Sequence, residues 1–150
     1  MATRIRRILF ASDFSKASGK AFATALTMAR SNRATLTVLH VMAPLVPVSP
    51  DQYIGPDTWQ QLDEDARRWT KRQLTALATK AKKTGVRVVG LLVDGNPAQQ
   101  IVRIAKNKRF DLLIIGTHGR TGIAKFFLGS VAGRVVATAT CPVLTVRGKE

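Results

Sequence analysis

The sequence predicts an α/β protein in which an open, twisted, parallel β-sheet carries helices on both faces. Apolar segments of strand length alternate with segments that repeat apolar residues at helical spacing, in the order β-α-β-α-β-α-β-α-β. The strand segments are apolar at most positions, which is typical of parallel strands covered by helices on both sides. The chain has 150 residues and contains no internal repeat or linker, so residues 1–150 are expected to form a single domain.

The first half of the chain predicts two strands separated by a helix. Residues 6–11 form a short apolar run that ends at the polar residues 12–15, whose side-chain oxygens can cap a helix over residues 16–30. Residues 32–33 end that helix, and the β-branched run over residues 35–41 predicts the second strand.

A proline-rich connection follows the second strand. Four prolines and a glycine interrupt every helix or strand register there, so we expect residues 43–57 to be a flexible Pro-rich loop within the domain. Such a loop can be a functional flap or a plain connector. Residues 58–83 return to helical spacing, and Gly85 ends that helix. Trp59 and Trp69 are expected to lie in the core or in an interface.

The second half of the chain completes the alternation. Residues 86–93 predict the third strand, and Asn96 followed by Pro97 predicts the start of the third helix. The remaining elements are a fourth strand, a fourth helix and a fifth strand, over residues 111–115, 130–138 and 143–146.

Charge is the most unusual bulk property. The chain carries 24 Lys and Arg against 9 Asp and Glu, a formal net charge of +15, which attracts polyanions of any kind and leaves nonspecific nucleic acid as a partner open. The single cysteine, Cys141, cannot form an intramolecular disulfide, and no Cys/His cluster has metal-ligand spacing. No apolar run approaches the roughly 20 residues that span a bilayer, so we expect a cytoplasmic protein without membrane partners.

Two common phosphate-binding motifs are absent. The dinucleotide motif G-x-G-x-x-G should follow the first strand, but the first glycine of the chain is Gly19. The motif G-x-x-x-x-G-K-[ST] does not occur either. These absences argue against a Rossmann dehydrogenase and against a P-loop NTPase.

Glycines cluster instead after the fourth strand. Gly116 and Gly119 are expected to allow positive φ and to let a phosphate or ribose approach the backbone. Gly129 and Ser130 stand at a predicted helix N-terminus, where unpaired N–H groups, the helix dipole and a hydroxyl favour an anion. In an open parallel sheet, ligands bind where the strand order reverses, so the ends of the first and fourth strands can form one pocket with Asp13 opposite the glycines.

Other side chains of this region have several possible roles. Arg120 and Lys125 lie inside the glycine loop, where they are well placed to meet phosphate charge. His118 has no partner acid or nucleophile beside it, so we expect a solvated or phosphate-side residue rather than a catalytic one. His40 lies within a strand and is expected to be packed. Asp13 can cap the first helix, a role that is compatible with recognition of a base.

The spacing G-x2-G-x9-G-[ST] after a fourth apolar strand resembles the nucleotide-binding motif of the universal stress protein family, in its ATP-binding subgroup. Further segments resemble the family in the same order, at residues 8–15, 36–41, 94–97 and 141–144. The resemblance covers essentially the whole chain. It implies a Rossmann-like five-stranded sheet, similar to the adenine nucleotide alpha hydrolases, with the strand order 3-2-1-4-5.

The resemblance also implies an adenine nucleotide site. The carboxylate of Asp13 would accept a hydrogen bond from the adenine amino group, with the Val41 backbone at the base, Ala11 and Ser12 along the base and ribose, and Gly116 at the ribose. Glycines of the loop and the first residues of the last helix would hold the phosphates. The expected binding residues are Ala11, Ser12, Asp13, Val41, Gly116, Thr117, Gly119, Arg120, Gly129, Ser130 and Val131. ATP is expected with Mg²⁺ or Mn²⁺ bridging its phosphates, and no carboxylate in the loop supplies an obvious protein ligand for the metal.

The resemblance implies a homodimer paired through Val143–Val146, an apolar edge strand that needs cover. It also implies that ATP is a regulatory ligand in a cytoplasmic stress response. No arrangement in the sequence would activate water, so we expect no enzyme and at most slow ATP hydrolysis. Two alternatives stay open: a nucleotide-free dimeric interaction protein of the same fold, working through its dimer surface and the flap, or a basic nucleic-acid-associated stress protein.

Overall fold

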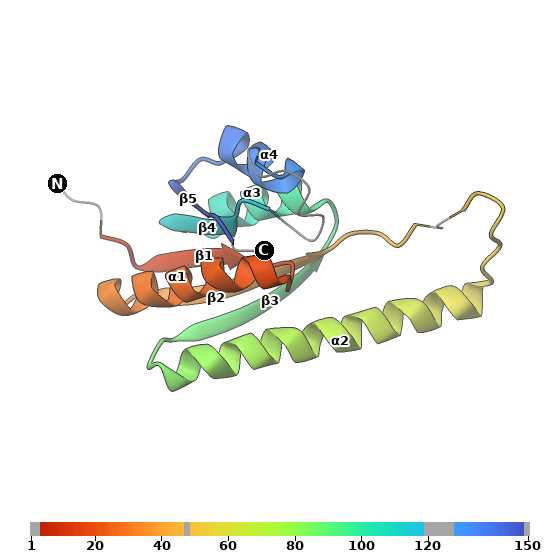
Figure 1. Cartoon of the computed structure of the whole chain (residues 1–150), viewed down its shortest axis with the longest axis horizontal. Coiled ribbons are helices and arrows are strands. Elements are labelled where there is room, and N and C mark those ends of the chain that lie inside the picture. The colour runs from red at the N-terminus through yellow and green to blue at the C-terminus, as the bar shows by residue number, and fades with distance from the viewer. Residues whose placement is uncertain (1–3, 47–48, 119–127, 149–150) are drawn as a thin grey trace.

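The computed structural model describes residues 4–46, 49–118 and 128–148, which form one five-stranded parallel sheet between two layers of helices (Figure 1). The strand order is β3-β2-β1-β4-β5, which confirms the order expected from the resemblance. The elements in chain order are β1 (Arg7–Ala11), α1 (Lys16–Asn32), β2 (Thr35–Met42), α2 (Pro56–Lys83), β3 (Val88–Asp94), α3 (Pro97–Asn107), β4 (Leu112–Gly116), α4 (Ser130–Thr138) and β5 (Val143–Val146).

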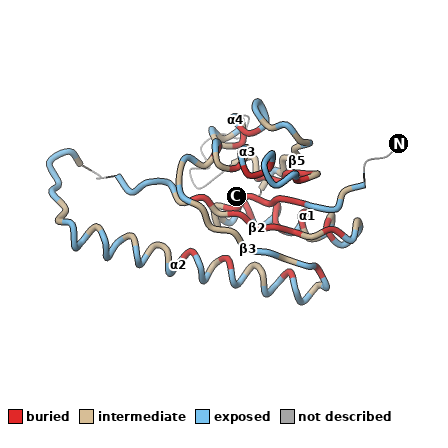
Figure 2. Tube along the Cα trace, turned by 180° about the vertical axis from the view of Figure 1, so that it is seen from behind, coloured by how far each residue is buried: buried red, intermediate tan, exposed pale blue. Residues whose placement is uncertain are grey.

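Alternation along the strands divides the core into two layers. Ile8 and Phe10 of β1 belong to the layer under α1 and α2, whereas Leu9 and Ala11 belong to the layer under α3 and α4. The central strands β1 and β4 are apolar on both faces because each face is covered by helices. Figure 2 shows the buried residues concentrated in these strands and in the facing sides of the helices.

Several element boundaries differ from the prediction by one or two residues. The proline-rich connection ends earlier than residue 57, because Pro56 stands in the first turn of α2, where its missing N–H costs no hydrogen bond. Helix α1 continues to Asn32 and ends at Arg33, whose φ of 53° closes the helix with a left-handed residue. Val86 precedes β3 because its N–H caps the end of α2 by donating to the Ala81 carbonyl.

Asp111 was predicted as the first residue of the fourth strand, but it lies just before β4. Its carboxylate oxygen Oδ2 accepts hydrogen bonds from the backbone N–H groups of Arg6 and Arg7, both at 2.9 Å. This carboxylate therefore joins the start of β4 to the start of β1, the central strand of the sheet and its neighbour.

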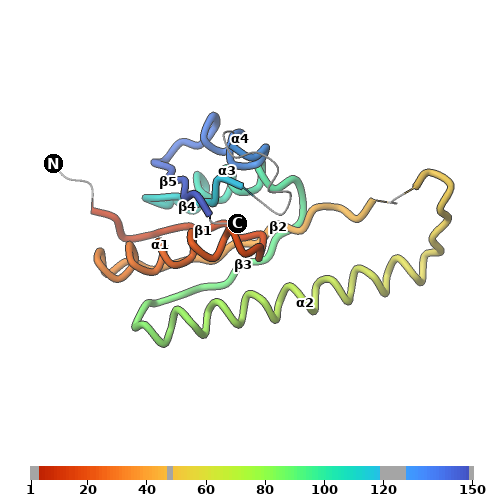
Figure 3. Tube along the Cα trace, in the orientation of Figure 1, coloured from red at the N-terminus to blue at the C-terminus, as the bar shows by residue number. Residues whose placement is uncertain are grey.

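Helix α2 is longer than the sheet that it covers (Figures 1 and 3). Its buried residues are Thr70, Leu74 and Ala81, all in its C-terminal half. The expectation that Trp69 could be a core residue is wrong, because it is 41% exposed. The interface alternative stays a prediction.

An ion-pair cluster holds the middle of α2 to the end of β3. The guanidinium of Arg67 donates to Asp94 of β3 and to Asp63 one turn earlier in the helix. These two carboxylates, Asp94 foremost, raise the pKa of Arg67 above its ordinary value. The cluster marks the point beyond which the N-terminal part of α2 leaves the sheet.

The sheet has β3 at one edge and β5 at the other. All four residues of β5 are half-buried. The chain beyond β5 passes close to the start of α1, since a Cβ added at Gly148 would come within 2.7 Å of the Cα and carbonyl oxygen of Ala17. In the described part of the chain, no helix combines the length and apolar character that crossing a membrane would require.

Truncation of Ile114 tests the layer beneath α1. Ile114 is fully buried in β4, so Ile114→Ala should lower the free energy of unfolding by about 2–5 kcal/mol through lost burial and a cavity. Val89 of β3 is 51% exposed, and Val89→Ala should cost less than about 1 kcal/mol. Urea unfolding of both variants measures the difference, and equal losses would contradict the described core.

Candidate functional site

A crevice opens at the carboxyl ends of β1 and β4, where the chain order of the strands reverses. The crevice has a volume of about 320 Å³ and is bounded by the ends of β1, β2 and β4 and by the first turns of α3 and α4. This is the position at which open parallel sheets bind ligands, because the connections from the two central strands diverge to opposite faces. The volume lies within the range of small-molecule sites.

The structure brings nine of the eleven predicted binding residues together around this crevice. They come from four separate segments and are Ala11, Ser12, Asp13, Val41, Gly116, Thr117, Gly129, Ser130 and Val131. Gly119 and Arg120 lie outside the described residues. The role of each residue in binding stays a prediction.

The site loop, residues 12–15, connects β1 to α1 and is fixed by its own side chains. The Ser12 hydroxyl accepts a hydrogen bond from the Phe14 N–H at 3.0 Å, and the Asp13 carboxylate accepts one from the Ser15 N–H at 2.9 Å. Phe14 has a φ of 62°, a left-handed backbone that is rare for a bulky residue and costs free energy. The loop therefore holds Asp13 at the crevice through a strained turn that its neighbours stabilise.

An aromatic cluster packs against Phe14 and stabilises the strained turn. The rings of Phe14 and His40 stack with 4.6 Å between centroids, and Trp69 of α2 meets Phe14 edge-on at 5.6 Å. His40 Nδ1 lies 2.8 Å from the Ser12 carbonyl oxygen, which can only accept, so Nδ1 carries the proton in this contact.

His40 also lines the crevice, which sequence reasoning missed by treating it only as a packed strand residue. Its position beside Val41 could have indicated this role. Ser18 and Pro97 line the crevice too, because the first turns of α1 and α3 approach it. Sequence reasoning did not identify these two either, since their positions depend on how the helices meet the sheet.

The N-terminus of α4 opens into the crevice without a side-chain cap. Gly129 is the residue before the helix, its N–H donates to the Thr117 carbonyl at 2.6 Å, and it has no side chain to accept from the helix. The first turn contributes N–H groups that have no acceptor within the helix. By contrast, Ser15 caps α1 and Asn96 caps α3 with side-chain oxygens. Helix α2 also lacks a side-chain cap but does not line the crevice, so among the described helices at the crevice the α4 terminus is the one suited to an anionic group.

Gly116 does not have the positive φ that was expected of it. Gly116 is the last residue of β4, and its φ lies outside the left-handed range, so positive φ does not explain the glycine. A Cβ at this position would make only ordinary contacts, the nearest at 3.7 Å from the His118 carbonyl oxygen. The fold of the described residues therefore has room for a Cβ at this position.

His118 lines the crevice beside Thr117. Its Nδ1 lies 2.9 Å from the Thr117 hydroxyl, whereas its Nε2 is buried and has no hydrogen-bond partner among the described residues. The His118 ring is therefore not fully solvated, because its Nε2 is buried.

A parallel sheet with a crevice at its reversal point and an uncapped helix N-terminus in that crevice defines a doubly wound α/β protein with an anion-accepting site. Residues 4–147 match the sequence model of the universal stress protein family. The chain belongs to the universal stress protein family.

Individual relatives agree with this assignment. A universal stress protein of Thermus aquaticus is 36% identical over 143 residues, which cover 95% of this chain and 98% of the relative. The solved structure of MJ0577, a universal stress protein of Methanocaldococcus jannaschii, superposes with a TM-score of 0.85 at 25% identity and covers 99% of both chains.

Two more distant structures share the fold and contain nucleotides. A universal stress protein in complex with cAMP has a TM-score of 0.71 at 23% identity, covering 98% of this chain and 100% of its own. The Arabidopsis thaliana protein At3g01520 with AMP bound has a TM-score of 0.70 at 22% identity, covering 96% of this chain and 92% of its own.

Removal of the Ser12 hydroxyl tests the construction of the site loop. Ser12→Ala should lower the free energy of unfolding by about 1–3 kcal/mol, because the Phe14 N–H loses its acceptor in a buried turn. Thr24→Ala is the control, since its exposed hydroxyl only donates to a carbonyl of its own helix and should matter by less than about 0.5 kcal/mol. Chemical denaturation compares them, and an unchanged Ser12 variant would exclude the described role of the hydroxyl.

Proposed function

We propose that this protein binds an adenine nucleotide, ATP, in the crevice as a regulatory ligand of a cytoplasmic stress response. The observation that carries the proposal is the uncapped N-terminus of α4 at one end of a crevice of about 320 Å³. The family membership supports it, as do the family structures that contain AMP and cAMP. A polar, anion-accepting end and an apolar middle suit the phosphates and the base of a nucleotide.

The base would lie between Asp13 and Val41. Strand β1 ends at Ala11 opposite Leu39, so β2 extends past its neighbour and Val41 has no β1 residue beside it. Backbone groups there are available to a base edge. The Asp13 carboxylate accepts one hydrogen bond from Ser15, and a carboxylate has further lone pairs for an adenine amino group.

The phosphates would lie at the first turn of α4. The N–H groups of Ser130 and Val131 and the Ser130 hydroxyl are hydrogen-bond donors in the crevice wall, and the helix dipole favours negative charge there. When bound, Mg²⁺ or Mn²⁺ would neutralise phosphate charge, with ligands mainly from phosphate and water oxygens. The Ser130 hydroxyl is the side-chain oxygen of this turn that could join them.

ATP would be held rather than turned over. The carboxylate in the described lining of the crevice is Asp13, which is engaged by the site loop and lies at the base end. Rapid phosphoryl transfer needs a group that orients the attacking water beside the terminal phosphate. We therefore propose a binding protein with at most slow hydrolysis.

The same proposal includes a homodimer through β5. This strand is an edge of the sheet, and its four residues are half-buried with one side unpaired in the single chain. Pairing with the same strand of a second copy would satisfy the backbone groups of that edge.

Nonspecific polyanion binding is a second candidate, favoured by the net charge of +15. Affinity for RNA or DNA should then fall steeply with salt, because binding releases counterions from the nucleic acid. Filter binding between about 50 and 200 mM salt separates this from nucleotide binding. Absence of binding at the low-salt end would remove this candidate.

Isothermal titration with ATP and Mg²⁺ tests the primary proposal. The variant Ser130→Pro removes one N–H and the hydroxyl from the α4 terminus, and the extended backbone of Gly129 accommodates a following proline. We expect Ser130→Pro to weaken ATP binding by about tenfold or more, since hydrogen bonds to charged groups contribute about 1.5–3 kcal/mol. Ser130→Ala, which keeps the N–H, should lose less.

The absence of binding heat would contradict the proposal. If the wild-type protein gives no heat with ATP at about 100 µM, a concentration that detects a weak site, nucleotide binding is wrong. Co-purified ATP or AMP, identified by mass spectrometry of ligand released from the protein, would argue independently against the nucleotide-free alternative.

Measurement of phosphate release tests separately whether ATP is bound without rapid hydrolysis. With saturating ATP and Mg²⁺, turnover should stay far below about 1 s⁻¹, the lower end of typical enzyme rates. A rate within the enzyme range, absent from a Ser130→Pro preparation, would show an ATPase instead.

A further inference from the structure

The N-terminal half of α2 projects past the sheet and past α1 (Figures 1 and 3). Figure 2 shows it mostly exposed, with the buried positions of the helix confined to the other half. Leu62 and Trp69 are 45% and 41% exposed in this region.

One line of exposed side chains along α2 has the spacing of a helix–helix seam, and exposed residues also occur on other faces of the helix. We call this line the α2 stripe, and its members alternate at four and three residues: Thr58, Leu62, Asp65, Trp69, Arg72 and Ala76. All six are exposed. Alternating four and three residues is the heptad spacing by which two helices pack along their length. The stripe lies beside the buried positions Thr70 and Leu74 and is separate from them.

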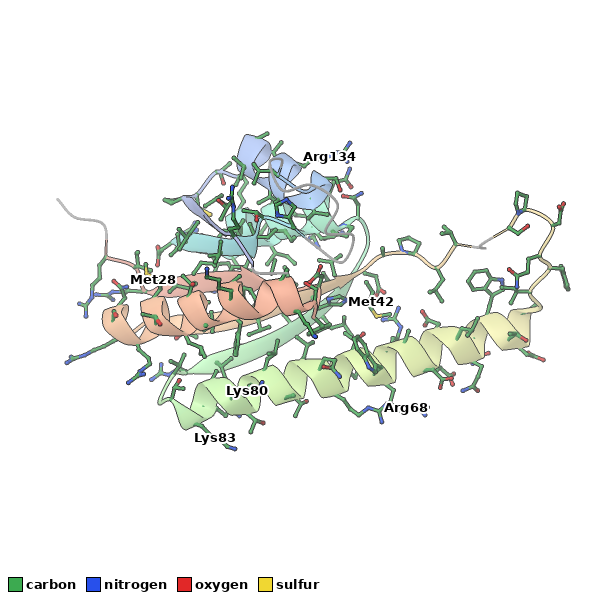
Figure 4. All side chains as sticks on the ribbon, viewed as in Figure 1. Met28, Met42, Arg68, Lys80, Lys83 and Arg134 are labelled. Atoms are coloured by element: carbon green, nitrogen blue, oxygen red, sulfur yellow. The ribbon has the colours of Figure 1, made fainter. Side chains whose placement is uncertain are left out.

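The charges of α2 are divided between its ends. Residues 56–66 contain four Asp or Glu and no Lys or Arg, whereas residues 67–83 contain seven Lys or Arg and no Asp or Glu. Lys80 and Lys83 lie at the basic end (Figure 4). An antiparallel pair of such helices sets each acidic half beside a basic half, so the helix is complementary to itself.

Within the α2 stripe, the residues that precede Trp69 are also complementary to the residues that follow it. Asp65 precedes Trp69 by four residues and Arg72 follows it by three. Leu62 precedes it by seven and Ala76 follows it by seven. A twofold axis at Trp69 therefore pairs Asp65 with Arg72 of a second copy, and Leu62 with Ala76, each twice.

The surface that would receive the projecting half is a groove between α1 and the C-terminal half of α2. This groove of about 130 Å³ is lined by Phe14, Gly19 and Phe22 on the α1 side and by Gln73, Ala76 and Lys80 on α2.

Gly19 lies inside helix α1, and a Cβ added to it would meet no atom within 4 Å. A glycine inside a helix costs about 1 kcal/mol relative to alanine, and here the monomer does not need it. The space beside Gly19 is therefore open on this face of α1.

We propose that two copies of this chain associate through antiparallel α2 helices, with the twofold axis at Trp69. Each projecting half lies over the α1–α2 groove of the other copy, and the Asp65–Arg72 pair occurs twice across the interface. This contact is distinct from β5, which is at the edge of the sheet beyond β4. It does not depend on nucleotide binding.

A charge-swap cycle tests the proposed pairing by sedimentation velocity. Asp65→Arg and Arg72→Asp each set like charges against each other twice, and each should raise the dissociation constant of the α2 contact by about tenfold or more. The double variant, D65R with R72D, restores opposite charges across the axis and should recover association. Association of the double variant can recover only if residues 65 and 72 of the two copies meet. A variant that merely disturbed the fold would not be rescued by the second substitution.

Matched controls lie one residue earlier along the same helix. Glu64 and Lys71 are both exposed, are also seven residues apart, and point away from the α2 stripe. Glu64→Arg and Lys71→Asp introduce the same charge changes and should leave the sedimenting mass unchanged. Equal effects of the control pair and the test pair would overturn the proposal.

Gly19→Leu separates association from folding. The substitution removes a helix-interior glycine, so the melting temperature should not fall, yet its side chain fills the groove and should abolish the contact. Loss of the α2 contact should halve the mass, from tetramer to dimer if β5 pairs and from dimer to monomer if it does not. An unchanged mass in Gly19→Leu and D65R, at concentrations of about 100 µM at which the wild type is assembled, excludes the interface. A monomeric wild type excludes it too.

Discussion

The pairing of β1 with β4 is the contact on which the rest of the structure depends. These strands are adjacent in the sheet although more than 100 residues separate them, and Asp111 joins their starting ends through the N–H groups of Arg6 and Arg7. Right-handed crossovers lead from β1 to β2 in one direction along the sheet and from β4 to β5 in the other, so the connections from β1 and β4 leave to opposite faces. The crevice is the space that this divergence opens, and the site loop and α4 are its walls.

Much of the fold could be predicted because local sequence and burial agree. Continuous apolar strands, the Asn96–Pro97 helix start and the last helix and strand follow from residues that act within their own segment. The sequence places Pro56 in the loop, whereas it is the first residue of α2. Proline interrupts the interior of a helix but is well tolerated in its first turn, and the sequence pattern does not show in which of these positions a given proline lies. The exposure of Trp69 was unpredictable because it depends on where the sheet ends.

The candidate site was predictable to the extent that it consists of backbone at strand ends. The carboxyl ends of adjacent parallel strands meet at one edge of the sheet, so Asp13 and Gly116 could be assigned to one crevice from the ends of the first and fourth strands. Val41 was assigned to it only through the family resemblance. The left-handed Phe14 and its stack on His40 could not, since no residue pattern encodes strain in a non-glycine turn. The same contact reaches Trp69, which connects the site loop to the exposed stripe of α2.

The path of the chain after β5 has a practical consequence for anyone who handles this protein. Gly148 passes so close to Ala17 that no side chain fits between them without movement, which puts Gly148 itself beside the first turn of α1. That turn follows the site loop directly. A segment inserted directly after Gly148 would therefore begin beside the turn that follows the site loop, whereas one inserted before β1 would begin at the opposite end of that strand.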